Sequence, residues 1–398
     1  MSRGASPAPS ATLRSHPSLE SPADLWNWRV RPYSRWAFRN VPKIIRSAVV
    51  ANEPNDVWAL ERTAKLARGS LAQRLVLQAT STDAIVVLID GKIVFESYEH
   101  GNDEHTPHIL MSATKSVVGL VLGILGSKGA INLEAPVTQY VPEVSETAYR
   151  NATIRDLMDM RSGVELSEAE ERACRIAAGW DPVSEGEAPQ SLHQWFAHLA
   201  VPVAPAGGPF RYISANTDLL GWAVERATGA SFASLVSDLL WKPMGAEHDA
   251  YLTLDREGSP RCTGGLCATA RDFARIGQLV VQNGLRGTRE IVPAAVIDDI
   301  ATNGDAEAWR TGQWGKAFGS ISKNMNYRSG WYVINDDPQL LFAMGIHGQN
   351  LFVDRRNRIV IAKFSSWSES TDYVALPLTH FTIDRLRRSI VKKRAKTA

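Results

Sequence analysis

The alternation of apolar and polar positions predicts a β-hairpin near the start of the folded chain. Residues 84–89 form a continuous apolar run, the pair Asp90-Gly91 follows it, and a second run begins at Lys92. An Asp-Gly pair between two such runs is the strongest short-range signal for a hairpin. We therefore expect two antiparallel strands here.

The last third of the chain repeats this style. Short apolar runs separated by turn residues occupy residues 329–334, 340–345, 351–353 and 359–362. This spacing predicts an antiparallel meander. A helix with Ile383, Leu386 and Ile390 on one face is expected to close the chain.

The middle of the chain, roughly residues 111–300, has a helical pattern with long loops. Residues 117–125 are apolar on all sides, which is typical of a core helix, and Gly126 and Gly129 end the run. Further helices are predicted over 218–228 and 271–283. Strands at both ends and helices between them predict an α/β fold, in which one antiparallel sheet is built from both chain ends, flanked by helices and interrupted by an inserted, mainly helical lobe.

The predicted domain boundaries follow from this pattern. Residues 1–22, rich in Ser, Pro and Ala, are expected to be a disordered tail. Residues 23–110 and 265–398 are assigned to the sheet domain, and residues 111–264 to the mainly helical domain. We expect the active site at their interface.

Composition excludes several classes of function. The chain has 398 residues, of which 44% are hydrophobic and 22% charged, with a net charge of +2. These values are ordinary for a soluble globular protein and favour neither a nucleic-acid nor a membrane partner. The basic clusters at the two ends are interpreted as solvated helices and tails.

Three cysteines, Cys174, Cys262 and Cys267, give no disulfide framework. Together with the absence of an apolar signal core in the first twenty residues, they favour a cytoplasmic location. His105 and His108 have a ligand-like spacing but no accompanying metal motif. We expect no metal and no cofactor.

Ser112 and Lys115 are the first candidates for chemistry. They lie directly before the apolar helix, and their spacing places a hydroxyl and an amine on one helical face, one turn apart. A desolvated lysine can be neutral and can take a proton from a neighbouring serine. The same spacing recurs from Ser320 and from Ser389, but in a polar loop and in a basic tail. The alternative is that Ser112 is only a helix N-cap.

Two further segments could complete a site for acyl transfer. Tyr212 follows a Gly-Gly-Pro approach and could present its phenol to Lys115, whose positive charge would lower the pKa of that phenol. A buried core tyrosine is the alternative. Gly345-Ile346-His347 could bring a backbone N–H close to a ligand, or could be a β-bulge.

These segments, in this order, resemble the Ser-x-x-Lys penicillin-recognising hydrolases. The resemblance rests on Ser112-Ala113-Thr114-Lys115, on Tyr212 before Thr217-Asp218-Leu219-Leu220-Gly221, and on the strand at Gly345. It covers roughly residues 80–365. The chain looks like the class C β-lactamase and carboxylesterase branch, and within it is most similar to the 6-aminohexanoate-dimer hydrolases, which cleave a linear amide and also act as carboxylesterases.

The resemblance implies a β-lactamase/transpeptidase-like fold and a role for each motif. Ser112 becomes the nucleophile, Lys115 its base partner and Tyr212 the shared proton carrier. The N–H groups of Ser112 and Ile346 become the oxyanion hole.

Two departures from the family pattern bear on the substrate. The family usually has Lys-Thr-Gly on the strand beside the nucleophile, whereas this chain has Ala343-Met344-Gly345. The missing cation argues against efficient β-lactam hydrolysis. Ser214 stands where the family usually has Asn two residues after the tyrosine. Both changes are compatible with esters or short linear amides.

The substrate pocket is predicted from position in the chain. Candidate binding residues are Asp181, Ser214, Trp331, Gly345 and His347, with Trp180 beside them. Asp181 could attract a substrate amine or could be a surface loop acid. His347 could line the pocket or make a core hydrogen bond.

The resulting hypothesis is a serine hydrolase that cleaves small-molecule carboxylic esters or short linear amides through an acyl-enzyme on Ser112. The alternatives are a β-lactamase or D-amino-acid peptidase and, from another class, a non-catalytic binding protein. A tryptophan-rich segment with Trp26, Trp28 and Trp36 could pack on a second copy, giving a homodimer, or on its own lobe.

Overall fold

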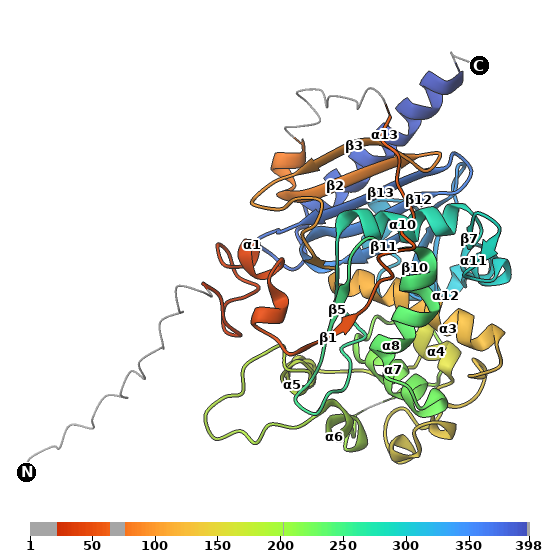
Figure 1. The fold of residues 1–398 in the computed structure, drawn as a ribbon. Helices are drawn as coiled ribbons and strands as arrows, with labels where there is room; N and C mark the ends of the chain where they lie inside the picture. Colours follow the sequence, from red (N-terminus) through yellow and green to blue (C-terminus); the bar gives the residue numbers. More distant parts are fainter. Residues whose placement is uncertain (1–21, 64–75, 202, 396–398) are drawn as a thin grey trace, which may run out of the picture.

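The computed structural model describes residues 22–63, 76–201 and 203–395. The tail predicted over residues 1–22 therefore lies, apart from its last residue, outside the described residues. The described chain folds into a large antiparallel sheet with helices on both faces, next to a mainly helical region (Figure 1). This is the predicted fold class. The proposed domain boundaries near residues 110 and 265 stay a prediction.

The large sheet has seven antiparallel strands in the order β3-β2-β13-β12-β11-β10-β9. They are β2 (Thr82–Ile89), β3 (Lys92–Tyr98), β9 (Met325–Arg328), β10 (Trp331–Ile334), β11 (Leu340–Gly345), β12 (Gln349–Asp354) and β13 (Ile359–Ser365). β2, from the first part of the chain, pairs with β13, from the last part, with Val87 opposite Ile361. The sheet thus combines strands from both ends of the chain, as predicted.

The turns explain where the strand predictions succeed and fail. Asp90 and Gly91 both have positive φ, as the predicted hairpin requires. The strand expected to begin at Ser329 begins at Trp331 instead. Ser329 and Gly330 have φ of 51° and 82° and form the turn between β9 and β10. β9 itself was not predicted, because it lies in a polar segment.

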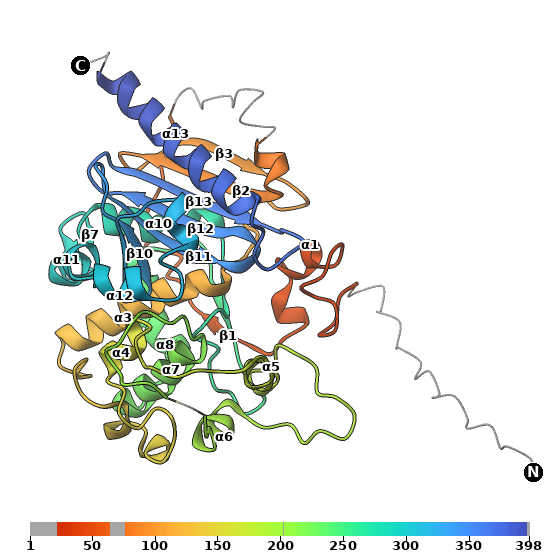
Figure 2. The same ribbon diagram turned by 180° about the vertical axis from the view of Figure 1, so that it is seen from behind.

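Two long helices cover opposite faces of the sheet. α10 (Ala270–Val281) lies on one face and α13 (Ala375–Ala395) on the other, as the views from the two sides show (Figures 1 and 2). Because side chains alternate along a strand, Val360 packs in the core under α10 while Ile361 packs in the core that includes Ile383 of α13.

The predicted core helix is α3 (Thr114–Ser127), in which every residue from Thr114 to Leu125 is buried. It contacts α7, α11, β10 and β11. The remaining helices are α1 (Ser34–Ala37), α4 (Ile154–Met158), α5 (Glu168–Ala177), α6 (Leu192–Ala197), α7 (Ala215–Thr228), α8 (Phe232–Val236), α9 (Lys242–Met244), α11 (Ala294–Thr302) and α12 (Ala306–Thr311). α4, α5 and α6 each begin with a capping box.

A smaller sheet has four strands in the order β1-β5-β6-β4. β7 (Leu285–Arg286) and β8 (Arg289–Glu290) form a separate two-stranded sheet. The smaller sheet contains β1 (Ser47–Val50), β4 (His108–Ile109), β5 (Ala250–Thr253) and β6 (Leu266–Ala268). Pairing of β4 with β6 places the approach to Ser112 beside the loop that precedes Leu266. No helix within the described ranges has the length and hydropathy needed to cross a bilayer.

Candidate active site

Ser112 lies in a single 3₁₀ turn, Met111–Ala113, that leads directly into α3. The backbone just before it is strained, because Met111 has a φ of 49°, a region that non-glycine residues rarely adopt. The N–H of Leu110 donates to the carbonyl of Leu266 at 2.8 Å and holds the approach. Ser112 is half-buried, and the cap position of α3 is Ala113, so the structure does not assign Ser112 the alternative role of helix N-cap.

Lys115 brings its amine to Ser112. Its Nζ lies 3.1 Å from Ser112 Oγ and 2.8 Å from the carbonyl oxygen of Thr263. The side chain is buried, and burial lowers its pKa well below the ordinary value. The nearby carboxylate of Asp218 opposes this shift and the guanidinium of Arg261 adds to it. The predicted neutral lysine beside a serine is supported.

A buried network that the sequence analysis missed holds Thr263 in place. Asp218, on α7, accepts hydrogen bonds from the guanidinium of Arg261 and from the N–H of Thr263, the latter at 2.9 Å. The Thr263 hydroxyl donates to the carbonyl of Ser214 at 2.6 Å. The available signal was the acid Asp218 directly before the apolar positions Leu219 and Leu220, since a carboxylate that becomes buried requires a partner.

Tyr212 places its ring against the Lys115 amine. Lys115 Nζ lies 4.8 Å from the centre of that ring, and Trp314 stacks on the ring at a centroid distance of 4.4 Å. Burial raises the pKa of the Tyr212 phenol, while interactions with Ser112 and Tyr332 oppose the rise. The expectation that a neighbouring cation lowers this pKa is wrong, because burial dominates and the neighbouring amine itself favours its neutral form.

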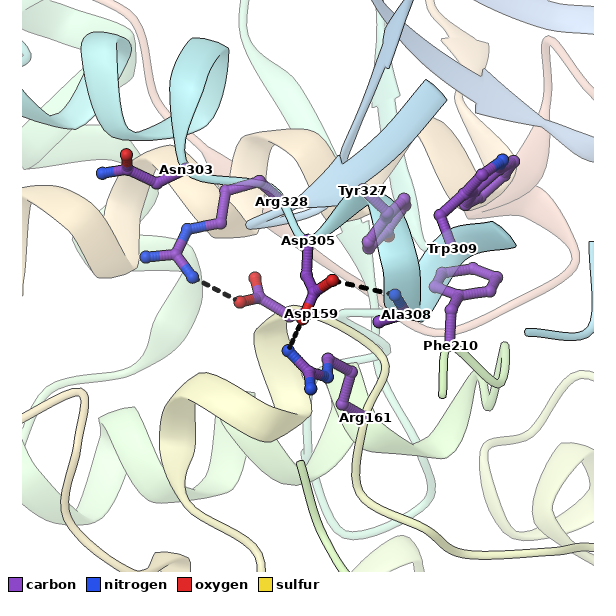
Figure 3. A pocket seen from close by; sticks show the side chains of 9 residues that line it. All are labelled: Asp159, Arg161, Phe210, Asn303, Asp305, Ala308, Trp309, Tyr327 and Arg328. Atoms are coloured by element: carbon purple, nitrogen blue, oxygen red, sulfur yellow. Dashed lines mark hydrogen bonds and ion pairs between the residues drawn. The ribbon is translucent and has the colours of Figure 1, made fainter. Parts of the chain in front are cut away.

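Arg161 anchors the loop that precedes Tyr212, and Figure 3 shows how Arg161 pairs with Asp305. Arg161 donates to the carbonyls of Gly207 and Gly208 and pairs with Asp305 at 2.9 Å. The N–H of Phe210 donates to the Ala308 carbonyl at 2.9 Å. These contacts fix where the chain enters Tyr212.

A small cavity of about 30 Å³ adjoins this loop. Asp159 and Arg328 pair across it at 2.7 Å, so its main charges neutralise each other (Figure 3). We interpret it as part of the loop anchor. The cavity is lined by Asp159, Arg161, Phe210, Asn303, Asp305, Ala308, Trp309, Tyr327 and Arg328.

The end of β11 lies directly against the backbone of Ser112. A Cβ on Gly345 would lie 2.4 Å from the Leu110 carbonyl oxygen and 3.0 Å from the Ser112 nitrogen. Only glycine allows this approach. The half-buried Ile346 follows at once, so the structure brings the two backbone segments of the predicted oxyanion hole together.

The predicted pocket residues have mixed outcomes. Trp331 is fully buried and donates from Nε1 to the Ser116 carbonyl at 3.1 Å, so it supports the nucleophile helix and does not line a pocket. His347 is buried, and its Nδ1 lies 2.9 Å from the Trp367 carbonyl oxygen. This is the core hydrogen bond that was the alternative interpretation. Burial lowers its pKa to about 4.

Asp181 is not available as a free acid. It pairs with Arg29 and with Arg175, whose Nε lies 2.8 Å from Oδ2. Two guanidinium groups already neutralise its charge, which argues against capture of a substrate amine. Ser214, half-buried, precedes α7 and makes no cap hydrogen bond. It therefore remains a candidate binding residue.

The tryptophan-rich segment packs largely on its own chain. Trp28 is buried and donates to the Trp180 carbonyl at 3.0 Å, whereas Trp26 is exposed. Cys174, Cys262 and Cys267 are free and buried. Within residues 22–63, 76–201 and 203–395, no three His, Cys, Asp or Glu side chains are grouped to hold a metal ion.

Comparison with known proteins agrees with this geometry. The family model described as Beta-lactamase matches residues 69–379. The chain belongs to the β-lactamase family. Because the chain belongs to this family and its relatives include an amide hydrolase and an esterase, it is a serine hydrolase.

The similar proteins found include amide hydrolases and esterases. A 6-aminohexanoate-dimer hydrolase from Paenarthrobacter ureafaciens is 32% identical over 365 residues, which is 89% of each chain. Esterase EstB from Burkholderia gladioli is 29% identical over 163 residues, covering 39% of this chain and 41% of EstB. A solved structure provisionally described as a 6-aminohexanoate-dimer hydrolase from Bacillus anthracis superposes with a TM-score of 0.82 at 26% identity, covering 95% of this chain and 99% of the other.

Proposed function

We propose that this protein hydrolyses open-chain carboxylic esters and short linear amides through an acyl-enzyme on Ser112. The observation that most supports this proposal is the buried Lys115 amine, 3.1 Å from Ser112 Oγ, in surroundings that favour its neutral form. A neutral amine at this distance can accept the serine proton as the hydroxyl attacks a carbonyl. A protonated lysine could not.

Tyr212 then acts as the proton donor to the leaving group. The phenol favours its protonated form because it is buried. As the tetrahedral intermediate collapses, Tyr212 gives its proton to the leaving oxygen or nitrogen and receives the proton held by Lys115. The serine proton thus ends on the leaving group. Water attacks the acyl-enzyme by the reverse use of the same groups.

The oxyanion hole is assigned to the N–H groups of Ser112 and Ile346. The close approach of Gly345 to Ser112 supports this assignment. Two preorganised donors stabilise the negative charge that develops on the carbonyl oxygen, and loss of one such donor typically costs about 10²–10³ in rate.

The substrate class follows from the groups present and from the names of the relatives. One relative is named for a linear amide dimer and another as an esterase. Ala343, at the position of the family's usual lysine, is fully buried in the core cluster that contains α3. It offers no cation for a β-lactam carboxylate. Because Asp181 is paired with two arginines, recognition of a substrate amine would need another group, so we rank esters above aminohexanoyl amides.

The test compares wild type with Ser112→Ala. Intact mass is measured after incubation with a fluorophosphonate, and turnover is measured with p-nitrophenyl butyrate, 6-aminohexanoate dimer and nitrocefin. We expect one adduct in wild type, none in the variant, and turnover that disappears with the adduct. The expected order of activity is ester, then dimer, then nitrocefin.

Each contrary result has a distinct meaning. Full esterase activity in Ser112→Ala would remove Ser112 as the nucleophile. Faster turnover of nitrocefin than of the ester would favour the β-lactamase alternative. Absence of both adduct and turnover would favour a non-catalytic binding protein.

A further inference from the structure

Tyr332, on β10, has a buried hydroxyl that the catalytic steps proposed above do not use. The residue is 2% exposed, and within the described residues no group lies at normal hydrogen-bonding geometry to its hydroxyl. A buried donor without a partner is costly, and such groups in native proteins call for a specific explanation.

The rings of Tyr332 and Tyr212 belong to one aromatic cluster, in which each lies nearly parallel to Trp314. Trp314 stacks on Tyr212 at 4.4 Å and 21°, and is also nearly parallel to Tyr332 at 6.2 Å and 14°. Phe342 stacks on Tyr332 at 4.9 Å. Because these rings fix the plane of Tyr332, its hydroxyl has little freedom to seek another partner.

Within this aromatic cluster, Tyr332 interacts electrostatically with Tyr212. Tyr332 is one of the two groups that lower the pKa of Tyr212 against the effect of burial. Burial raises the pKa of Tyr332, and Tyr212 raises it further. These opposite directions are those of a pair in which Tyr332 donates and the Tyr212 oxygen accepts.

We propose that Tyr332 is a positioning residue that donates a hydrogen bond to the Tyr212 oxygen during proton transfer to the leaving group. In that step the Tyr212 O–H bond breaks, its proton passes to the leaving atom, and the proton held by Lys115 passes to the Tyr212 oxygen. Negative charge develops on that oxygen between the two transfers. A rigid donor aimed at developing charge stabilises it more than it stabilises the resting state.

The proposal rests on the proposed function and makes a prediction that a packing role does not. A p-nitrophenolate leaving group needs no proton, whereas an alkoxide or an amine does. Loss of the Tyr332 hydroxyl should therefore slow acylation by substrates with poor leaving groups and leave acylation by p-nitrophenyl esters nearly unchanged.

The experiment compares Tyr332→Phe with wild type, using ethyl butyrate and p-nitrophenyl butyrate, which form the same acyl-enzyme. The measured quantity is kcat/KM, which reports acylation for both. We expect a loss of roughly 10- to 100-fold with the ethyl ester, the size expected for a hydrogen bond to a charged acceptor. The p-nitrophenyl ester should change by less than about threefold.

Tyr327→Phe is the matched control. Tyr327 is also a buried tyrosine with an unpaired hydroxyl, and its ring lies 4.8 Å from that of Tyr332. We expect it to affect the two esters equally. Equal losses on both esters in Tyr332→Phe, matching the control, would overturn the proposal. Thermal unfolding checks that both variants fold.

The two hypotheses fail separately. If Ser112→Ala keeps its esterase activity, the proposed function fails whatever Tyr332 does. If Ser112→Ala is inactive and Tyr332→Phe shows no leaving-group dependence, only the positioning role fails.

Discussion

Lys115 donates a 2.8 Å hydrogen bond to the carbonyl oxygen of Thr263, and this contact fixes the amine next to the nucleophile. The carbonyl is itself immobilised, because the Thr263 N–H bonds Asp218 and its hydroxyl bonds the Ser214 carbonyl. A flexible lysine side chain therefore has one defined position, 3.1 Å from Ser112 Oγ. Such preorganisation is what proton transfer within a catalytic site requires.

The first prediction concerns the charge of Lys115. Lys115→Arg keeps a cation but cannot deprotonate, so we expect kcat/KM for p-nitrophenyl butyrate to fall by about 10³-fold or more. In wild type the lysine must be neutral. Activity should therefore be lost as pH falls through the pKa of Lys115, which burial places well below the ordinary value for a lysine. The pH profile of kcat/KM in wild type measures this loss. Activity of the arginine variant close to that of wild type would contradict the prediction.

The second prediction concerns the carboxylate that faces this amine. Asp218→Asn removes a negative charge that raises the pKa of Lys115, so the acid limb of the pH profile should move to lower pH. It also leaves Arg261 buried without its ion-pair partner. Breaking a buried pair in this way costs about 3–5 kcal/mol of the free energy of unfolding. Denaturant unfolding and the pH profile measure the two effects.

An exposed ion pair provides the comparison for Asp218. Asp298 pairs with Arg355 at 2.9 Å, and the Asp298 side chain is 63% exposed. Exposed pairs contribute about 0–1 kcal/mol, so Asp298→Asn should leave both stability and the acid limb nearly unchanged. An acid limb that stays fixed in Asp218→Asn would show that this carboxylate does not tune Lys115.

The third prediction concerns the end of β11. In Gly345→Ala the new methyl group would lie 2.4 Å from the Leu110 carbonyl oxygen, and that contact can be relieved only by moving the backbone next to Ser112. We expect esterase kcat to fall by about 10²-fold or more, the size of losing one oxyanion donor. Gly319→Ala should keep full activity, because no described residue other than its chain neighbours comes within 4 Å of the added Cβ. Equal activity in the two variants would contradict the assigned oxyanion hole.

Sequence patterns predicted most of the fold because its signals are local. The turn at Asp90-Gly91 and the uniformly apolar run of α3 depend on neighbouring residues only, and the structure confirms both. The Ser112–Lys115 contact was predictable for the same reason, since helix geometry joins positions three apart. β9 was missed because its polar residues become buried only through long-range packing.

The residues that surround the Lys115 amine could not be predicted from local sequence patterns, because they lie far away along the chain. Thr263 lies 148 positions from Lys115, and no spacing rule connects them. Asp181 was considered either a group that attracts a substrate amine or a surface loop acid, but Arg29, 152 positions away, pairs with it. The predicted direction of the Tyr212 pKa shift was wrong for a related reason. Charge on a neighbour can be inferred from sequence, whereas the extent of burial that outweighs it cannot.

The last prediction concerns the acid stability of the fold. His380, on α13, is buried between Phe342 and Phe352, with ring centroids at 4.9 and 5.2 Å, and its Nε2 has no partner within the described residues. Burial lowers its pKa to about 4, against an ordinary value of 6.5. The unfolded chain therefore binds more protons between these values, and stability is lost as pH falls from about 6.5 towards 4.

His380→Phe removes this proton uptake and keeps a ring in the same site. At pH 4.5 we expect the variant to exceed wild type by roughly 2–3 kcal/mol in the free energy of unfolding, beyond any difference at pH 8. Urea unfolding at the two pH values measures this. The exposed His198, changed to Phe, should show no such pH-dependent gain. If His380→Phe gains equally at pH 4.5 and pH 8, the gain comes from packing and the buried histidine does not limit acid stability.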